Sequence, residues 1–231
     1  PILLVSIKKQ YEGQAFKVAQ AFWGAGQMMF NKALIVFDSD VDLRDYNALI
    51  KIIVKNLVSS SQIMLSKGPI DVLDHSTNVA GMGGKVCIDC TAQLDIASND
   101  EFSFNYLYER SYEKIDVDAF IKGNSINKGC VICLEPEMKD IRPELQLWYI
   151  LNNTDPQRDI FVLEQDGLFV IVVDGRRKKH NRNWPNVIAM DKKTIQKVNQ
   201  KWPILFQVPF IKSPTLEVES LVLGDRAELE N

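Results

Sequence analysis

Residues 33–42, ALIVFDSDVD, place five consecutive apolar side chains directly before a run of alternating acids. An uninterrupted apolar run of this length is typical of a short strand that is buried on both faces. The acids Asp38, Asp40 and Asp42 are suited to cap a helix over residues 46–53, where apolar residues recur at helical spacing. A strand that leads directly into a helix is the building unit of an α/β fold.

The same alternation of strands and helices continues on both sides of this unit. Residues 2–7, 61–65 and 86–89 predict three further strands, and residues 15–23 predict an amphipathic helix. Strands that alternate with helices imply crossover connections and a mostly parallel sheet. We therefore expect an α/β protein, a three-layer α/β/α sandwich around a mostly parallel or mixed sheet.

A second strand–helix–strand unit begins at residue 130, with an acidic turn after its first strand. Its strands at residues 130–134 and 159–163 repeat those at residues 33–37 and 61–65, displaced by 97 to 98 positions. The likeness fits either an internal duplication or the general similarity of such units. We expect the second unit to add its strands to the same sheet.

The composition is that of a globular cytoplasmic protein, with 231 residues, 46% of them hydrophobic and 25% charged, and a net charge of -3. No apolar run approaches the roughly 20 residues that span a membrane. The chain opens on a strand after Pro1, without Met or a signal sequence, as expected of a piece of a longer polypeptide. The expected divisions are an α/β core at residues 1–98, an elaboration packed on the same domain at residues 99–212, and an acidic tail at residues 213–231.

Four cysteines form two Cys-x-x-Cys pairs, Cys87 with Cys90 and Cys130 with Cys133. The spacing is similar to that of a four-thiolate zinc site. Side chains three positions apart on a strand point to opposite faces, however, so Cys130 and Cys133 are poorly placed to share a metal. We expect buried free thiols and no metal site.

Two other motifs are similar to ligand-binding loops, but the spacing of their residues excludes a calcium loop and a phosphate-binding loop. The acids at residues 38–42 open like a calcium loop, but Leu43 and Leu49 occupy the positions that require glycine and glutamate. Residues 81–85, GMGGK, lack the spacing and the helix of a phosphate-binding loop, so a glycine-permitted tight loop is expected there.

The basic run at residues 176–180, with Arg182, stands alone on an acidic chain, so we expect a solvated loop and no nucleic-acid partner. His75 and His180 are far apart in sequence, and neither has a nearby nucleophile. Chemistry-bearing residues alone therefore predict no active site in this chain.

Several segments together resemble a known family. They occur in its order and are LVSIKKQYEG at residues 4–13, QMMFNK at 27–32, DSDVD at 38–42, PIDVLD at 69–74 and GMGGK at 81–85, followed by Ile88 and Asp89. Over roughly the first 92 residues the chain resembles the carboxyl-terminal domain of UbiD-family decarboxylases, of the 3-octaprenyl-4-hydroxybenzoate carboxy-lyase type.

The resemblance has departures and an extension. The family usually carries Pro and His near Glu12 and Gln14, and small residues where Cys87 and Cys90 stand. Residues 129–202 resemble the longer members assigned to menaquinone biosynthesis.

The resemblance implies a decarboxylase whose central domain binds prenylated FMN with a divalent metal, manganese, and potassium, and carries a Glu-Arg-Glu catalytic set. None of those motifs is found in this chain, so the catalytic residues are expected outside it and the chain alone is expected to be inactive and free of cofactor. Its implied partners are the amino-terminal and flavin-binding domains of the same polypeptide, in a homo-oligomer.

In that enzyme this domain would cover the active site, or serve only as an oligomerisation module. The residues expected to line the substrate pocket are Gln27, Met28, Phe30, Pro69, Ile70, Asp71, Val72 and Leu73. The competing interpretation makes Met28 and Phe30 ordinary core residues.

Overall fold

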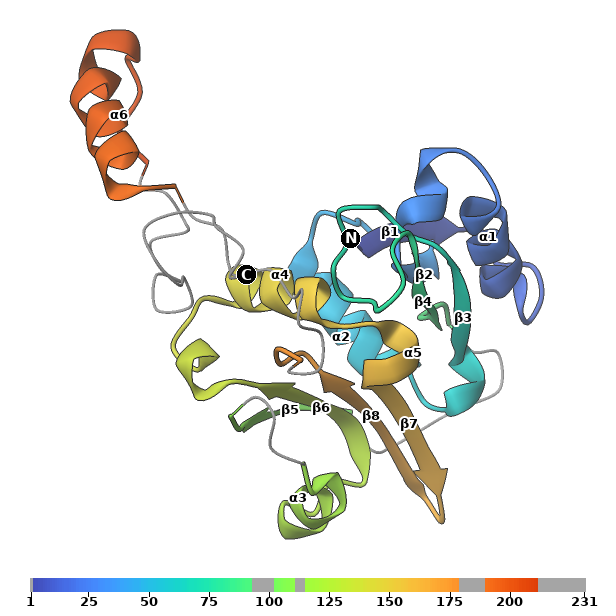
Figure 1. Ribbon diagram of the computed structural model, residues 1–231. Helices are drawn as coiled ribbons and strands as arrows, with labels where there is room; N and C mark the ends of the chain where they lie inside the picture. Colours follow the sequence, from blue (N-terminus) through green and yellow to red (C-terminus); the bar gives the residue numbers. More distant parts are fainter. Residues whose placement is uncertain (1, 93–101, 111–114, 179–189, 212–231) are drawn as a thin grey trace.

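A computed structural model describes residues 2–92, 102–110, 115–178 and 190–211 of the chain (Figure 1). Its first half contains β1 (Ile2–Ile7), α1 (Gln14–Trp23), η1 (Gln27–Phe30), β2 (Ala33–Asp38), α2 (Tyr46–Asn56), η2 (Ser60–Gln62), β3 (Ile63–Pro69) and β4 (Met82–Asp89). Its second half contains β5 (Ser103–Tyr108), α3 (Val117–Gly123), β6 (Lys128–Leu134), η3 (Pro136–Met138), α4 (Pro143–Asn153), α5 (Pro156–Asp159), β7 (Ile160–Gln165), β8 (Leu168–Asp174) and α6 (Lys192–Leu205). The predicted acidic tail lies outside the described residues.

The strands form two sheets of four, in the orders β1-β2-β4-β3 and β5-β6-β8-β7. In each sheet the first three strands are parallel and the last, β3 or β7, is antiparallel to its neighbour. The predicted α/β class and the mostly parallel, mixed strand pairing are confirmed. The expectation that the second unit would extend the first sheet is wrong.

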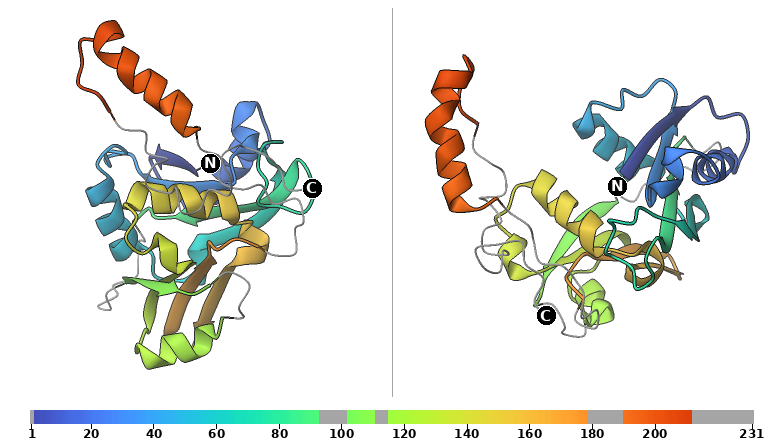
Figure 2. Two further views of the ribbon diagram at one scale, coloured as in Figure 1. Left: turned by 60° about the vertical axis from the view of Figure 1, so that its left-hand side comes forward. Right: turned by 45° about the horizontal axis from the view of Figure 1, so that its top comes forward.

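The second sheet does not extend the first because it buries one face against the first unit. Cys130, Ile132 and Ile171 on this face share a core cluster with Leu57 and Ile63 of the first unit. Burying a whole sheet face removes more apolar surface from water than pairing one more edge strand would. Figure 2 shows the second sheet lying beneath α2 and the first sheet.

The other face of each sheet is covered by the helix that follows its first strand. Ala15 and Ala19 of α1 pack on Leu34, Val36 and Cys87. The same arrangement recurs in the second unit, where Ile121 of α3 packs on buried residues of the second sheet, namely Val131, Cys133, Val170 and Val172.

Both units also close their parallel strands in the same way. In each unit two neighbouring strands, β2 and β4 or β6 and β8, end at or just before a carboxylate. Both carboxylates accept hydrogen bonds from backbone N–H groups that lie two or three residues after the end of β4 or β8. The pairs are Thr91 N–H to Asp89 Oδ1 (3.0 Å), Ala92 N–H to Asp38 Oδ2 (2.7 Å), Arg176 N–H to Asp174 Oδ1 (3.1 Å) and Arg177 N–H to Glu135 Oε1 (2.7 Å). The two units are therefore structural repeats, down to the hydrogen bonds at their strand ends.

The repeats differ most in the hairpin that ends each sheet. Ile63 and Ile160 begin equivalent strands and are 97 positions apart, whereas their partners Ile88 and Val173 are 85 apart. The first hairpin is thus 12 residues longer between these pairs. Ten of the extra residues are in the loop 70–81 between β3 and β4, which replaces the turn at residues 166–167, and the other two form one more strand pair.

The cysteines are confirmed to face different ways. Cys130 belongs to the cluster between the units and Cys133 to the cluster beneath α3. All four thiols are free and buried, and burial raises the pKa of Cys87, Cys130 and Cys133 to about 12. Such thiols stay protonated and behave as small apolar side chains.

The residue that caps α2 lies about one helical turn later in the sequence than expected. Asp45, not one of the acids at residues 38–42, precedes the helix and accepts a hydrogen bond from the Ala48 N–H (3.0 Å). A capping side chain must come directly before the first helical residue, and Asp42 is too far ahead of Tyr46 to reach. Among the described residues no helix is both long and apolar enough to cross a membrane.

Gly84 sets the contact between the repeats, and its replacement tests that contact. A Cβ at this position would collide with Asp155 Oδ1 and the Gln157 N–H at the start of α5. We expect Gly84→Ala to lower the free energy of unfolding by about 1–3 kcal/mol, the usual cost of overpacking. Urea denaturation measures it, with Gly123→Ala as the control because a Cβ there meets no atom within 4 Å. Equal losses in both variants would contradict a tight contact at Gly84.

Candidate functional site

The two segments predicted to line a pocket lie at the same end of the first sheet. Residues 27–30 form η1, which leads into the start of β2, and the loop 70–81 joins the end of β3 to the start of β4. The Val86 N–H donates to Lys32 O (2.8 Å), and Pro69 pairs with Met82, so the starts of β2 and β4 lie next to the end of β3. This end of the sheet, with η1 and the loop, is the candidate site.

Lys85 is the buried centre of the site, with 1% of its surface exposed. Its Nζ donates to Met29 O (2.6 Å) and Asn31 O (2.7 Å), the carbonyls at the end of η1, and lies 5.6 Å from the centre of the Trp23 ring. Gly68 on β3 leaves room for it, because a Cβ there would lie 2.9 Å from Lys85 Cε. Burial lowers the pKa of Lys85 from 10.5 to about 8, although the negative charge of Asp74 opposes the change.

A second buried lysine, Lys32, fastens the loop. Its Nζ lies 2.8 Å from Asp74 Oδ2 and donates to Ser76 Oγ (2.7 Å). Ser76 in turn donates from its N–H (2.9 Å) and its hydroxyl (2.6 Å) to Asp74 Oδ1. The loop is therefore held by charge-assisted hydrogen bonds to the residue just before β2.

The pKa values of this pair follow from burial and mutual attraction. Burial lowers the pKa of Lys32, and the charge of Asp74 counteracts only part of that effect. Burial alone would raise the pKa of Asp74, but the charge of Lys32 and the hydrogen bonds from Lys32 and Ser76 bring it below its ordinary value. Asp74 is therefore ionised at neutral pH.

The second repeat closes the site from the side. Arg158 donates from Nη2 to Ser76 O (2.9 Å) and from Nε and Nη2 to the carboxylate of Asp159 (2.8 and 2.7 Å). The Gly84 N–H donates to Asp155 Oδ1 (3.0 Å). Both the loop and β4 are thus tied to α5.

From this point a line of ion pairs continues through the second repeat. Its pairs are Lys32 with Asp74 (2.8 Å), Arg158 with Asp159 (2.7 Å), Lys178 with Asp159 (3.6 Å) and with Asp174 (3.3 Å), and Arg176 with Asp174 (3.0 Å). The expectation of a solvated basic loop is wrong for Arg176 and Lys178, which are 5% and 9% exposed. Asp174 lies just before these residues in sequence, whereas their other partners, Arg110 O for Arg176 (2.9 Å) and Asp159 for Lys178, are distant and are not revealed by spacing along the chain; Lys179, His180 and Arg182 lie outside the described residues.

The predicted pocket residues divide into buried and exposed sets. Ile70 is 2% exposed and packs under the loop against Gly83, so it supports the loop and does not face outward. Asp71 forms the turn, its Oδ1 accepting from the Leu73 N–H (2.9 Å). The outward-facing members are Gln27, Met28, Pro69, Val72 and Leu73, while Phe30 is half-buried.

Three apolar side chains therefore face outward at the site, with exposed fractions of 45% for Met28, 74% for Val72 and 78% for Leu73. The competing interpretation of Met28 as a core residue does not agree with this exposure. Apolar side chains held outward by a buried ionic anchor are typical of a surface that contacts something else.

Lys32, Lys85 and Asp74 were not predicted from the sequence. The one available signal is a lysine directly beside a buried strand, as Lys32 before residues 33–37 and Lys85 after two glycines. A buried lysine requires a partner, and only the fold shows which one.

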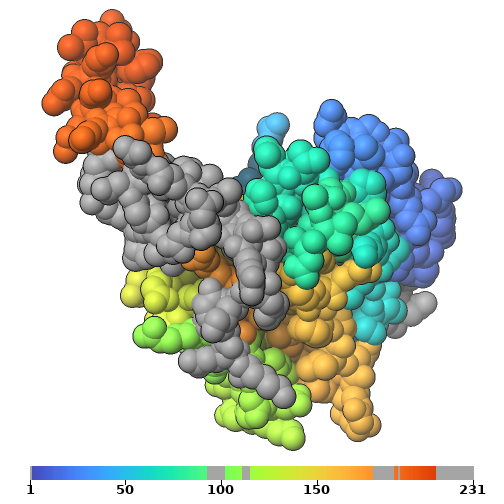
Figure 3. All heavy atoms as spheres, in the orientation of Figure 1, coloured from blue at the N-terminus to red at the C-terminus, as the bar shows by residue number. Residues whose placement is uncertain are grey.

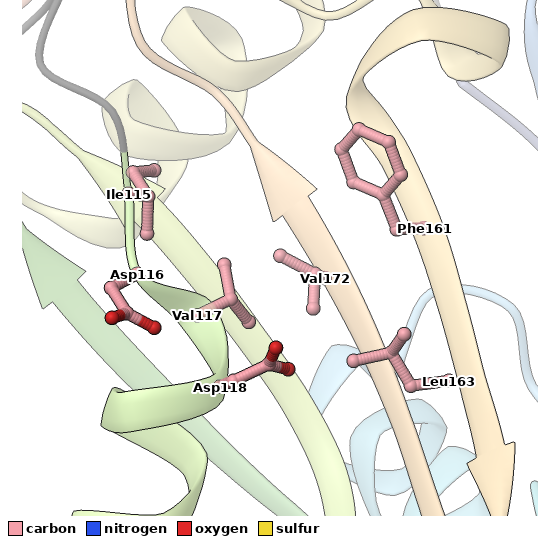
Figure 4. A pocket seen from close by; sticks show the side chains of 7 residues that line it. All are labelled: Ile115, Asp116, Val117, Asp118, Phe161, Leu163 and Val172. Atoms are coloured by element: carbon pink, nitrogen blue, oxygen red, sulfur yellow. The ribbon is translucent and has the colours of Figure 1, made fainter.

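A separate pocket of about 430 Å3 lies on the second repeat between α3 and β7 (Figure 4). It is lined mainly by apolar side chains, and its residues are far in sequence from Lys32 and Lys85. No group of three or more His, Cys, Asp or Glu that could hold a metal occurs among the described residues.

Comparison with known proteins matches the first repeat to one family. Residues 1–90 match the family model of the 3-octaprenyl-4-hydroxybenzoate carboxy-lyase C-terminal domain. The first repeat is thus related to UbiD carboxyl-terminal domains.

Curated relatives extend further but are longer than this chain. An uncharacterized protein of Helicobacter pylori strain J99 is 28% identical over 232 residues, which is 87% of this chain and 38% of the relative. An uncharacterized protein of Aquifex aeolicus is 45% identical over 89 residues, 38% of this chain and 18% of its own length. The chain thus spans under two-fifths of the length of these relatives.

Two solved structures align with parts of the chain. The UbiD-class enzyme HmfF from Pelotomaculum thermopropionicum, in complex with FMN, aligns with 20% identity and a TM-score of 0.36 over 52% of this chain and 24% of that one. Vanillic acid decarboxylase of Sedimentibacter hydroxybenzoicus aligns with 23% identity and a TM-score of 0.38 over 53% and 25%. Scores this low do not establish a shared overall fold.

Titration of Lys85 predicts how stability depends on pH. Because its pKa is about 8 in the folded chain and 10.5 ordinarily, the unfolded chain binds more protons between those values, and the free energy of unfolding rises with pH across that window. We expect this rise to be smaller in Lys85→Met than in the unaltered chain, measured by urea denaturation from pH 7 to pH 10, because Lys32 and Lys178 also have lowered pKa values and remain. Parallel pH profiles for the two proteins would contradict the lowered pKa.

Proposed function

We propose that this chain is the carboxyl-terminal part of a prenylated-FMN-dependent decarboxylase, a carboxy-lyase that acts on an aromatic or unsaturated acid. In the intact enzyme it covers the substrate side of the flavin site and contributes to subunit contacts. The match of residues 1–90 to the carboxy-lyase C-terminal domain supports the family. The observation that carries the role is the outward-facing apolar surface of η1 and the loop 70–81.

The two buried lysines would give that surface a fixed shape. Lys85 holds the end of η1 through Met29 O and Asn31 O, and Lys32 holds the loop through Asp74. Neither lysine is exposed, so both serve to position the surface. A rigid apolar wall excludes water and selects among substrates by shape.

The chemistry of the reaction is assigned to the rest of the enzyme. Prenylated FMN supplies an electron sink for loss of carbon dioxide when bound. The described residues do not fit the metal that accompanies it, because no cluster of metal-binding side chains is present among them. In this proposal, the catalytic residues, the flavin, manganese and potassium belong to the amino-terminal and flavin-binding domains, as the family resemblance implies.

The alternative is an oligomerisation module without influence on the substrate. It is favoured by the exposed apolar side chains of α6 and the segment after it, among them Ile204, Leu205 and Ile211. Placement of the acid in quinone biosynthesis rests only on the resemblance of residues 129–202 to longer family members.

The isolated chain provides a direct test of where the chemistry resides. We expect it to fold, to retain no flavin, and to release no carbon dioxide from aromatic acids when supplied with prenylated FMN. Flavin absorbance after gel filtration and carbon dioxide release measure these outcomes. Decarboxylation by the isolated chain would place the catalytic residues within it.

Leu73 tests the covering role in the intact enzyme. We expect Leu73→Trp to change the relative kcat/KM values among acids by about tenfold, since filling a pocket wall shifts specificity by a few kcal/mol at most. Flavin content should stay unchanged because the cofactor contacts other domains. The control is Ile50→Trp, which enlarges an exposed apolar side chain on α2, 49% exposed against 78% for Leu73.

An altered subunit assembly with unchanged acid preference in Leu73→Trp would favour the oligomerisation module. Equal changes in acid preference in Leu73→Trp and Ile50→Trp would also contradict a specific role for the loop.

A further inference from the structure

The pocket on the second repeat is an apolar groove with acidic side chains on one side. Its apolar residues are Ile115, Val117, Phe161, Leu163 and Val172, and its carboxylates belong to Asp116 and Asp118 (Figure 4). We refer to these seven residues as the α3–β7 groove. Its volume of about 430 Å3 lies in the range of roughly 300–1,000 Å3 that is usual for binding pockets.

Comparison of the repeats explains why the groove is open. Met64 on β3 occupies the place of Phe161 on β7, since Met64 pairs with Cys87 and Phe161 with the equivalent Val172. The ten-residue helix α1 reaches Met64, which packs against its core and lies 4.0 Å from Gln20 Nε2. The equivalent helix α3 has seven residues, and Phe161 remains 52% exposed. The groove is thus the space that a longer helix covers in the first repeat.

Helix α6 is amphipathic, and within the part of the chain that the structure describes it makes no extensive contact with either repeat. It stands clear of both sheets in the ribbon views (Figures 1 and 2), and its atoms project from the upper left of the molecule in Figure 3. Val198 is 46% exposed, and Trp202, on the same face one turn further on, packs against Phe206 with ring centres 4.5 Å apart. Residues 192–211 contain four lysines and no acid, although the chain as a whole is acidic.

We propose that α6 of one copy of this chain docks in the α3–β7 groove of a second copy. The apolar face of α6 matches the apolar floor of the groove, and its lysines match Asp116 and Asp118 in charge. In Figure 1 and in the left view of Figure 2, α6 and α3 lie at opposite ends of the molecule, which favours a second copy as the partner. A reciprocal exchange about a twofold axis closes both grooves and covers both helices. This interface does not depend on the proposed decarboxylase role.

Replacement of an apolar side chain by aspartate, either in the groove or on α6, tests the contact. Sedimentation equilibrium of the chain is expected to show a dimer, and Phe161→Asp and Val198→Asp are each expected to raise its Kd about 30-fold, the effect of losing one hot-spot side chain. Leu147→Asp is the control for the first, because Leu147 is 46% exposed on α4 outside the groove. Gln200→Asp is the control for the second, because it adds the same charge to another face of α6.

Charge exchange tests the pairing itself. Lys201→Glu is expected to weaken the dimer, and Asp118→Lys in the same chain is expected to restore part of the lost affinity, because each copy then presents the reversed charge pair to the other. Asp118 is chosen because Asp116 caps α3 and its loss would disturb the helix.

Three results would overturn the proposal. One is a chain that stays monomeric while Phe161→Asp increases the exposure of Trp202, which indicates docking within one chain. Another is equal Kd values for Phe161→Asp and Leu147→Asp. The third is a monomer that binds vesicles of anionic phospholipid and loses that binding in Val198→Asp, which assigns α6 to a membrane surface.

Discussion

The carboxylate of Asp155 accepts a hydrogen bond from the Gly84 N–H, 3.0 Å away, and this contact fixes how the two repeats meet. It requires the backbone of β4 to approach α5 without a side chain between them. Because Asp155 also caps α5 through the Gln157 N–H (3.0 Å), the same carboxylate sets the start of the helix that carries Arg158. The position of Arg158 against the loop 70–81 therefore follows from one glycine.

The buried ion pairs then make that meeting specific. Charges removed from water cost free energy unless each finds a partner, and removal of one partner leaves the other charge uncompensated. Asp159 contacts both Arg158 and Lys178, so a shift of α5 would disturb two pairs at once. A purely apolar junction would tolerate such a shift more easily. We infer that these charges select one relative arrangement of the repeats more than they add to stability.

The sequence predicted most of the elements, but not β5, α3 or the assembly of the two sheets. Runs such as residues 33–37 and 130–134 identify buried strands, because a strand with apolar side chains on both faces must be covered on both faces. The same runs do not say what covers each face, so the expectation of one shared sheet was wrong. Lys32 and Lys85 are charged residues whose partners lie far away in sequence, and local spacing assigned the basic run to solvent although Asp174 lies just before it. Of the candidate site, the two segments were predicted, whereas the lysines that anchor them became visible only in the fold.

The repeats suggest why the candidate site belongs to the first of them. Both units share strand order, register and the carboxylate bonds at their strand ends, so these features serve the architecture and not one particular activity. The loop 70–81 is found in the first hairpin, while the second turns through residues 166–167. Residues that hold this loop, Lys32 and Asp74, accordingly have no counterpart in the shared framework. An added loop that is anchored by buried charges and exposes apolar side chains is more readily explained by contact with another surface than by folding, since the second repeat folds without one.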